Sequence, residues 1–395
     1  MKRLLTFFLI CFSFVEYTRA EDIIDYKYWD EGKLTWDDFQ DTLSLKGVPS
    51  AFNAFLRIEK TEKRDGNTRT IRPEAQACFD KRHSFADRQI QNENLLRLFQ
   101  LKYDLLEMYR RRLQTELNLG VVGIAADNRT RQYMDLYTEQ SKKAEQETEN
   151  GQNEIKLQEW EFYVTKELIE NPAPSIPRIS PRRFGYGFYL GTGASFPVGN
   201  IADYWAPAWQ INVGFDLAYA NTHLLCDFSA GTARTRQEIT VSNGQITDKW
   251  LRNGHNTYTS ISLGIGQQLI STKYFALMPY VGCIWSGYSD QAKIQEGRNE
   301  RTTLSYTNFN WTAGICFDYR FSTTISLVPS FWRGHREIFT ASIRTKLFIN
   351  REQFHNFKIA PDDNGSMLRG CKLGFSVACL GFSRLLQIKK TIFTT

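Results

Sequence analysis

Acidic pairs are the residues whose types and spacing best fit general acid–base chemistry. Asp37 and Asp38 follow a tryptophan, and Asp104 and Glu107 stand one helical turn apart. Acidic residues after a tryptophan are more typical of the first turn of a helix, where they favour its free N–H groups. The second pair precedes Arg110–Arg112, as is typical of ion pairs along one helix face. Neither pair predicts catalysis.

Histidines and cysteines form no reactive group either. His255 and His335 lie near expected loops, but no Ser-His-Asp order accompanies them. His83 is the only histidine in the first half of the chain. The seven cysteines include no CxxC and no short spacing, so neither a disulfide framework nor a cysteine metal site is predicted. We expect isolated apolar side chains.

Length, charge and the first residues narrow the class of protein. The 395 residues suffice for two domains, and the net charge of +6 arises without a basic stripe. Nucleic acid is therefore not an expected partner. Residues 1–20 join a basic start, an apolar core and a final alanine, the pattern of a secretory signal peptide. No later apolar run reaches the length of a transmembrane helix.

The first half, residues 21–170, is charged and helix-prone. Phe99, Leu106 and Leu113 recur at intervals of seven, so one apolar face runs along a long helix. Three helices and one short strand are expected, at 92–118, 130–150, 154–170 and 51–58. The pattern predicts a mainly helical α+β domain.

Three stretches of this half resemble a family of exported metallopeptidase-like domains. They are LTWDDF at 34–39, LLRLFQLKYDLLEMYRRRLQ at 95–114 and ETENGQNEIKLQEWE at 147–161. The resemblance covers roughly residues 30–170. Members carry HEQxHFD in the long helix and T-x-H-G later. The resemblance implies that, in the family, the two helix histidines face one metal ion and the glutamate acts as general base.

This sequence departs from the family where the chemistry would be. The helix-histidine positions hold Leu98 and Lys102, the glutamate position holds Phe99, and the later histidine position holds Asn150. None of these supplies the imidazole or general base, and a protonated lysine repels a metal ion. The family scaffold survives at Gln100, Tyr103, Asp104, Glu107, Arg112, Leu113, Gln158 and Trp160. We predict a pseudoenzyme domain without catalytic residues, metal or cofactor.

Residues 171–183 separate the two halves. They hold four prolines and no apolar periodicity, which favours an extended, semi-rigid linker.

The second half, residues 184–382, alternates between apolar and polar or small side chains. In Trp209–Tyr219 the alternation lasts eleven residues, the length that a tilted strand needs to cross a bilayer. Phe215 is expected to face lipid and Asp216 the lumen. The pattern recurs at 184–191, 224–231, 257–270, 273–287, 305–321, 323–332, 336–349 and 369–382.

Links between these strands are of two kinds. Those at 220–221, 271–272 and about 322 are short, and those at 234–256 and 288–304 are long and polar. This asymmetry is typical of outer-membrane β-barrels, which have even strand numbers. With 354–360 as a short extra strand we predict a transmembrane antiparallel barrel of about ten strands, or eight if two weak strands are over-read. A basic tail, 383–395, follows where such barrels commonly end on an aromatic residue.

The inward face of the expected barrel carries both signs of charge. Its polar residues are Gln210, Asn212, Asp216, Asp227, Asn308, Asn310, Asp318, Arg344, Lys346 and Lys372. Opposite charges in a small barrel most often neutralise each other and fill the lumen, which we predict here. A solute pathway is the alternative.

Three functions fit this interpretation. The leading one is a non-enzymatic outer-membrane protein whose barrel anchors a periplasmic binding or scaffolding domain. Its partners would be outer-membrane lipid and a periplasmic protein or cell-envelope component. The second is a small channel or transporter with an accessory periplasmic domain. The third is a residual hydrolase.

Overall fold

In the computed structural model the chain divides into two compact units. The helical unit comprises residues 1–59 and 74–175, and the barrel unit comprises 60–73 and 176–395. The structure describes residues 26–41, 49–175, 179–242, 247–290, 305–328, 336–354 and 368–388. The expected boundary at 171–183 gives no hint that 60–73 belongs with the C-terminal half.

Some expectations fall outside the described residues. These are the signal peptide at 1–20, most of the strand at 354–360, His335 and the end of the tail at 383–395. Among the residues that the structure describes, none of the helices is both long and apolar enough to cross a membrane.

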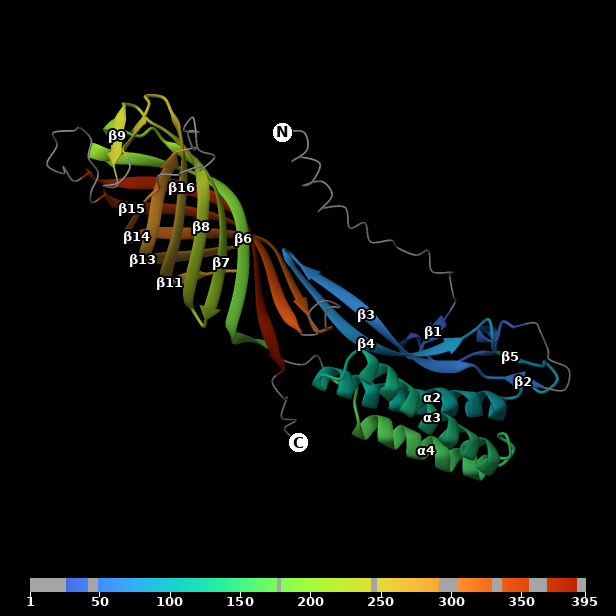
Figure 1. Cartoon of the computed structure of the whole chain (residues 1–395). Helices are drawn as coiled ribbons and strands as arrows, with labels where there is room; N and C mark the ends of the chain where they lie inside the picture. The colour runs from blue at the N-terminus through green and yellow to red at the C-terminus, as the bar shows by residue number, and fades with distance from the viewer. Residues whose placement is uncertain are drawn as a thin grey trace. The chain divides into compact units, whose positions relative to one another are not determined.

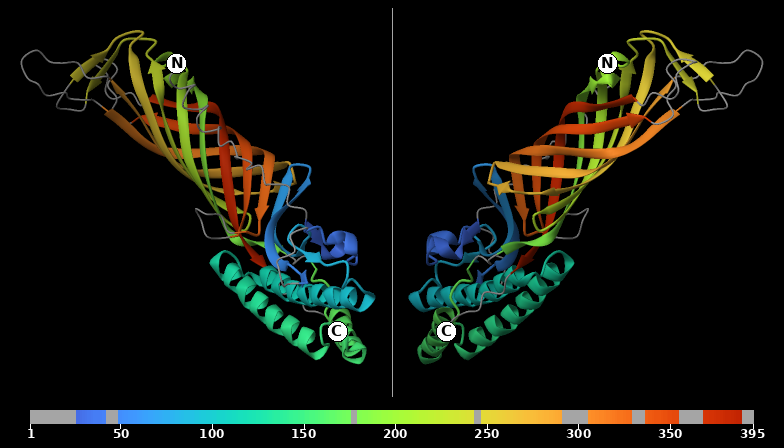
Figure 2. Two further views of the ribbon diagram at one scale, coloured as in Figure 1. Left: turned by 90° about the vertical axis from the view of Figure 1, so that its right-hand side faces the viewer. Right: turned by 90° about the vertical axis from the view of Figure 1, so that its left-hand side faces the viewer.

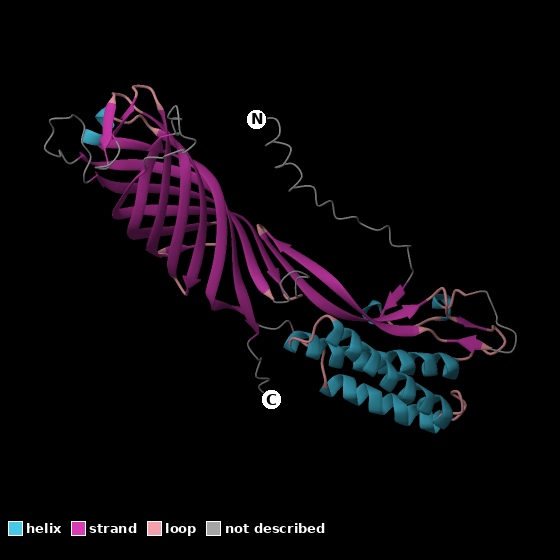
Figure 3. Ribbon diagram, in the orientation of Figure 1, coloured by secondary structure: helices cyan, strands magenta, loops and turns pink. Residues whose placement is uncertain are grey.

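The helical unit packs three helices beside strands (Figures 1 and 3). The helices are α2 (Glu93–Leu119), α3 (Ile124–Glu147) and α4 (Glu154–Glu170). The strands of this unit are β1 (Tyr26–Tyr28), β2 (Ser50–Ala51), β5 (Phe85–Ala86) and parts of β3 (Ala54–Asp65) and β4 (Thr68–Asp80). Asn92 and Asn153 begin α2 and α4 by accepting backbone N–H bonds, as N-cap residues do. The three expected helices are present, with α3 starting earlier. The expected strand at 51–58 is divided between β2, which ends at Ala51, and β3, which begins at Ala54.

The core of the helical unit is apolar and follows the seven-residue pattern of α2. Phe99, Leu106 and Leu113 are buried in it with Phe79 and Leu157. Burying each such side chain stabilises the fold by about 1.5–3 kcal/mol, so this stripe largely decides where α2 packs.

The barrel unit contains eight long strands. They are β6 (Ile179–Gly199), β7 (Ala208–Tyr219), β8 (Thr222–Arg234), β11 (His255–Gln267), β13 (Phe275–Asp290), β14 (Ser305–Ser326), β15 (Glu337–Phe354) and β16 (Leu368–Ile388). Each pairs antiparallel with the next in this order, and β16 pairs antiparallel with β6. The pairing of the described strands therefore returns to its starting strand and closes the wall where all eight strands pair. Figure 2 shows these strands curving round a common axis.

The ring of described strands has eight members, so the expectation of about ten is wrong and the alternative of eight holds. The segment 323–332 is not a separate strand, because β14 continues to Ser326 through a register shift between Arg320 and Ser322. Such a bulge inserts one residue and breaks a period-two pattern, which made one strand read as two. The short link expected near 322 is this bulge.

Two strands are also longer than expected. β6 begins at Ile179, inside the predicted linker at 171–183, and β16 runs to Ile388, inside the predicted tail at 383–395. Their first and last residues pair with each other, from Leu386 opposite Pro181 to Ile388 opposite Ile179.

The two faces of each strand differ as the alternation predicts. On β7 the side chain of Phe215 is 56% exposed on the outside, whereas Asp216 is fully buried inside. Trp209, Ile211 and Leu217 are exposed with Phe215 on the outer face. In water this arrangement would be unfavourable on both faces. In a lipid bilayer the apolar outer face would be favourable.

The two ends of the barrel have different connections. At the short-turn end, β7 and β8 are joined at Ala220–Asn221 and β11 and β13 at 268–274, which includes β12 (Ile270–Ser271). At the long-loop end, β8 and β11 are joined by 235–254, which includes β9 (Ile239–Ser242) and β10 (Thr247–Trp250).

The hairpin tip at 60–73 pairs with β14 at the short-turn end. Beyond Tyr319, where β13 stops pairing, Thr323–Ser326 pair in parallel with Thr68–Ile71 of β4. The Asn67 side-chain amide donates to the backbone carbonyl of Arg320 at 2.9 Å. The tip thus covers the one edge of β14 that the shorter β13 leaves unpaired.

Candidate functional site in the barrel interior

Inward side chains of β15 define three levels along the barrel axis. Period-two alternation puts Arg344, Lys346 and Glu352 on the inner face, from the short-turn end toward the long-loop end. Each is buried, and each meets a partner of opposite charge from other strands.

The lowest level, nearest the short-turn end, is a network around Arg344. Its Nε donates to Asp318 Oδ1 at 2.7 Å, and its Nη2 donates to Asp216 Oδ2 at 2.8 Å. His223 Nδ1 lies 2.7 Å from Asp216 Oδ1. Strands β7, β8, β14 and β15 are thereby joined across the lumen.

The middle level is built around Asp227. Lys346 Nζ lies 2.5 Å from Asp227 Oδ2, and the Tyr189 hydroxyl donates to Oδ1. A Cβ built at Gly214 would lie 2.2 Å from Tyr189 Cζ, so this glycine makes the space through which Tyr189 crosses β7. Lys346 Nζ also lies 4.4 Å from the centroid of the Tyr280 ring.

The highest level joins an ion pair to an aromatic cap. Lys372 Nζ lies 3.3 Å from Glu352 Oε1 and 3.7 Å from the centroid of Tyr258. The Tyr288 ring stacks on Trp205 with centroids 4.6 Å apart. Trp205 and Tyr288 belong to a buried cluster at the long-loop end that also includes Ile239 and Trp250.

Within the described residues, these three levels place paired charges across the lumen, as the sequence predicts. Of the expected inward residues, all except the partly buried Asn310 are buried, and each acidic or basic one among them is ion-paired. A cavity in the middle of the barrel holds only about 30 Å³. That is room for only a few water molecules.

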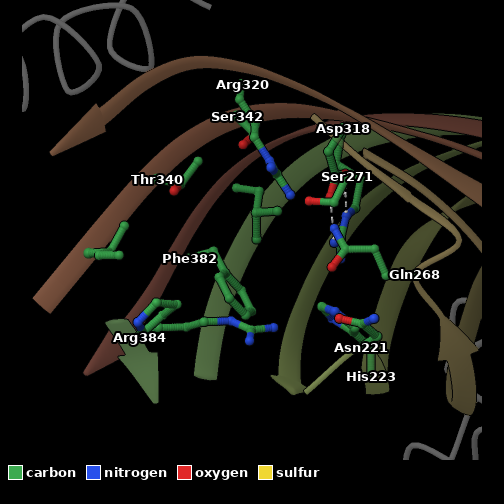
Figure 4. A pocket seen from close by; sticks show the side chains of 14 residues that line it. Asn221, His223, Gln268, Ser271, Asp318, Arg320, Thr340, Ser342, Phe382 and Arg384 are labelled. Carbon is green, nitrogen blue, oxygen red and sulfur yellow. Dashed lines mark hydrogen bonds and ion pairs between the residues drawn. The ribbon is translucent and has the colours of Figure 1, made fainter. Parts of the chain in front are cut away.

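A larger cavity of about 280 Å³ opens at the short-turn end (Figure 4). Its lining comes from β6, β8, β14, β15 and β16 and from the short turns, and consists of Pro181, Asn221, His223, Gln268, Ser271, Asp318, Arg320, Ile338, Thr340, Ser342, Arg344, Leu380, Phe382 and Arg384. The Arg344 network forms its inner wall, so the cavity ends where the filled lumen begins.

The positions singled out by the metallopeptidase resemblance are occupied by core packing. Leu98 and Phe99 are buried in the apolar core. Lys102 Nζ lies 2.5 Å from Glu145 Oε1 and 4.7 Å from the centroid of the Phe52 ring. Asn150 is exposed at φ 56° after α3. Within the described ranges, no group of three or more His, Cys, Asp or Glu side chains is placed to hold a metal ion.

The two acidic pairs are held by structural contacts. Asp38 accepts from Lys27 Nζ at 2.6 Å and from the Thr35 backbone N–H at 2.9 Å. Burial alone would raise the pKa of Asp38, but these bonds and the Lys27 charge hold it below its usual value. Glu107 is buried between Arg110 at 2.5 Å and Arg111 at 2.8 Å.

Asp104 differs from these because its partners are neutral. It accepts from Trp29 Nε1 at 2.8 Å and Gln100 Nε2 at 2.7 Å. Burial raises the pKa of Asp104 above its usual value, and the two hydrogen bonds offset this only in part.

Sequence reasoning missed Glu352 and the aromatic partners of the lysines. The expected strand ended at Ile349, whereas β15 continues to Phe354. Carrying the alternation from Lys346 on by six residues places Glu352 inside. Tyr189 alternates in phase with Gly185, Gly187 and Gly191, and this position in the pattern could have placed it on the inner face.

Comparison with known proteins finds likeness to barrels. No protein-family model matches the chain, and none of the curated proteins matches it. Ail, the attachment invasion locus protein of Yersinia pestis, solved with a heparin analogue, is 11% identical over 51% of this chain and 99% of that chain, with a TM-score of 0.27. A major outer membrane protein of Thermus thermophilus is 11% identical over 51% and 98%, with a TM-score of 0.23.

The N-terminal β-barrel domain of Pseudomonas aeruginosa OprF is a third such structure. It is 11% identical over 53% of this chain and 100% of that chain, with a TM-score of 0.21. Because these scores are low, the strand pairing of this chain, and not the likeness, establishes the barrel.

Proposed function

We propose that this protein is a non-enzymatic outer-membrane β-barrel that anchors a periplasmic binding or scaffolding domain. The observation that carries the proposal is the inverted sidedness of the closed ring, with aromatic and aliphatic side chains outside and paired charges inside. A bilayer is the solvent that favours both faces at once. Two of the three links at the short-turn end, 220–221 and 268–274, are shorter than the links at the other end, which fits the periplasmic and outer ends of such barrels.

The filled lumen supports an anchor over a channel. Charged groups cross it at three levels, and an aromatic cluster packs at the long-loop end. A permeating solute would have to break these buried ion pairs, each of which costs several kcal/mol to separate.

The helical unit offers an exposed apolar stripe for a partner. Ile155, Phe162 and Ile169 of α4 follow each other at seven-residue intervals, and Phe162 is 73% exposed. Side chains at this spacing lie along one line of a helix, as in helix pairs. A periplasmic protein or envelope component packing on this stripe is the proposed partner.

The pseudoenzyme part of the proposal rests on the same unit. Its resemblance to metallopeptidase-like domains concerns the scaffold, while Leu98, Phe99, Lys102 and Asn150 supply neither ligand nor base. Purified full-length protein incubated with zinc is expected to bind no stoichiometric metal and to cleave no peptide. Chelator-sensitive cleavage would favour the residual hydrolase instead.

Fractionation and conductance together test the anchor. The full-length chain should fractionate with the outer membrane and migrate differently in SDS gels before and after heating. In planar lipid bilayers it should give no reproducible single-channel current. The variant Lys346→Ala with Asp227→Ala removes only the middle level and should also give no current, because the levels on either side still cross the lumen. A steady current from the unaltered protein would favour the channel.

A further inference from the structure

We propose that the cavity at the short-turn end of the barrel is a binding site for a small organic anion with an apolar body. The inference goes beyond the anchoring function, because an anchor needs a sealed lumen but no recess at this mouth.

Two buried nitrogen atoms of residues that line the cavity have no hydrogen-bond partner among the residues that the structure describes. Arg344 uses Nε and Nη2 on the two aspartates, while its Nη1 is buried without a hydrogen bond. His223 uses Nδ1 on Asp216, while its Nε2 is likewise buried without one. A buried polar atom left unpaired costs about 1–3 kcal/mol. Arg344 Nη1 is a donor, whereas His223 Nε2 donates only when the imidazole carries both protons, because Nδ1 faces the Asp216 carboxylate.

The charge around the cavity is positive. The charged residues are Arg320, Arg344 and Arg384 against Asp318 and, behind Arg344, Asp216. With three positive charges and two negative ones, the excess is one positive charge before His223 is counted. A monoanion neutralises it, whereas a cation would meet the arginines.

The arginines at the opening still have donors to offer. Arg384 gives one Nη2 bond to the Ala220 carbonyl at 2.6 Å, and Arg320 gives one Nη1 bond to the Thr272 carbonyl at 2.7 Å. Those backbone bonds hold both guanidinium groups at the mouth. Each has further N–H groups, and guanidinium N–H groups match a carboxylate in pairs. Figure 4 shows Arg320, Arg384 and His223 around the cavity.

The remaining wall is apolar on one side. Phe382 lies beside His223 with ring centroids 5.7 Å apart, and Leu380 and Ile338 also line the cavity. The volume of about 280 Å³ is just below the range of drug-sized sites. An aromatic or branched aliphatic carboxylate fits this combination of cationic mouth and apolar wall better than a bare inorganic ion.

The test uses calorimetric titration of the purified full-length protein in detergent micelles with sodium benzoate. Benzoate is expected to bind with a dissociation constant on the order of 1 mM, and benzyl alcohol and benzylammonium at least about tenfold more weakly. Inorganic phosphate should also bind more weakly, because it gains nothing from the apolar wall. Equal binding of phosphate and benzoate would overturn the organic ligand class. No benzoate binding would overturn the site.

Two variants locate the binding. Arg384→Gln at the mouth should weaken benzoate binding about tenfold. Arg351→Gln removes the same charge near the long-loop end of β15 and should leave binding unchanged. Thr340→Leu fills the cavity without touching a charge and should weaken benzoate more than phosphate. Heat modifiability in SDS gels verifies that each variant is folded, and equal loss in both arginine variants would refute the location.

Discussion

The helical unit and the barrel unit place apolar side chains on opposite sides: inside in the helical unit and outside in the barrel. In the helical unit Phe99 and Leu113 are inside, and buried charges such as Lys102 and Glu107 are ion-paired. In the barrel unit Phe215 is outside and Asp216 inside. The contrast teaches that the surrounding solvent, and not the residue type, decides which face a phenylalanine takes. On the proposed function, one chain carries both arrangements because the helical unit is surrounded by water and the barrel by lipid.

The largest expected effect comes from removing the buried cation Arg344 from the interior of the barrel. Arg344→Met leaves Asp216 and Asp318 buried without it, and should destabilise the barrel by about 3–5 kcal/mol. The urea concentration at which heat modifiability is lost measures this.

A compensated variant separates charge from packing. Arg344→Met combined with Asp216→Asn and Asp318→Asn removes the charges together and should recover most of the loss. If the triple variant is as unstable as the single one, the network stabilises the barrel through packing and not through charge pairing.

The matching change in the helical unit is Phe99→Ala. It opens a cavity among Trp36, Phe39 and Phe52 and should cost the helical unit roughly 3 kcal/mol. Tryptophan fluorescence during urea unfolding reports it. The heat-modifiable barrel transition should stay where it is, and a shift of that transition by a similar amount would mean that the two units do not unfold independently.

The effect of lipid itself is tested by putting one charge on each outer surface. Phe215→Lys places an ammonium on the outer face of the barrel and should cost about 2 kcal/mol or more in lipid bilayers if it lies near the midplane. Phe162→Lys makes the same exchange on α4, where Phe162 is even more exposed, and should change stability by less than about 0.5 kcal/mol. Equal small effects would show that water, not lipid, surrounds Phe215.

The period-two alternation of the sequence predicted which side chains face inward on each strand. It could not predict which of them contact each other across the lumen. Alternation placed Asp216, Asp227, Arg344 and Lys346 inside because a strand has one geometric period. It could not pair them, because Arg344 is 128 residues from Asp216 and joins it only across the closed lumen. The bulge near Arg320 hid the continuity of β14 for a related reason, since one inserted residue reverses the phase.

The cavity and the hairpin tip were beyond any local pattern. Arg384 stood in the expected tail, and its role at the mouth depends on the length of β16. Thr68–Ile71 are mostly polar, and nothing in their sequence predicts that they pair with β14.

The smallest expected effect sharpens the comparison within the helical unit, where Asp104 and Asp38 respond to pH with opposite signs. Burial raises the pKa of Asp104, so the folded state holds this proton more tightly than the unfolded state. The helical unit therefore loses stability as the pH rises from about 4 through the raised pKa. Asp104→Asn keeps an acceptor oxygen for Trp29 and Gln100 and should be more stable than the unaltered protein at pH 7, with the difference shrinking toward pH 4.

Asp38→Asn is the matched control with the reverse sign. Lys27 and Thr35 hold the pKa of Asp38 below its usual value, so its contribution is present above about pH 4 and is lost as the pH falls through the lowered pKa. The variant should be less stable than the unaltered protein at pH 7, and the difference should vanish in acid. Urea midpoints from tryptophan fluorescence at several pH values measure both variants. Slopes of the same sign would contradict the assignment, because only a carboxylate buried among neutral partners gains from protonation while an ion-paired one loses by it.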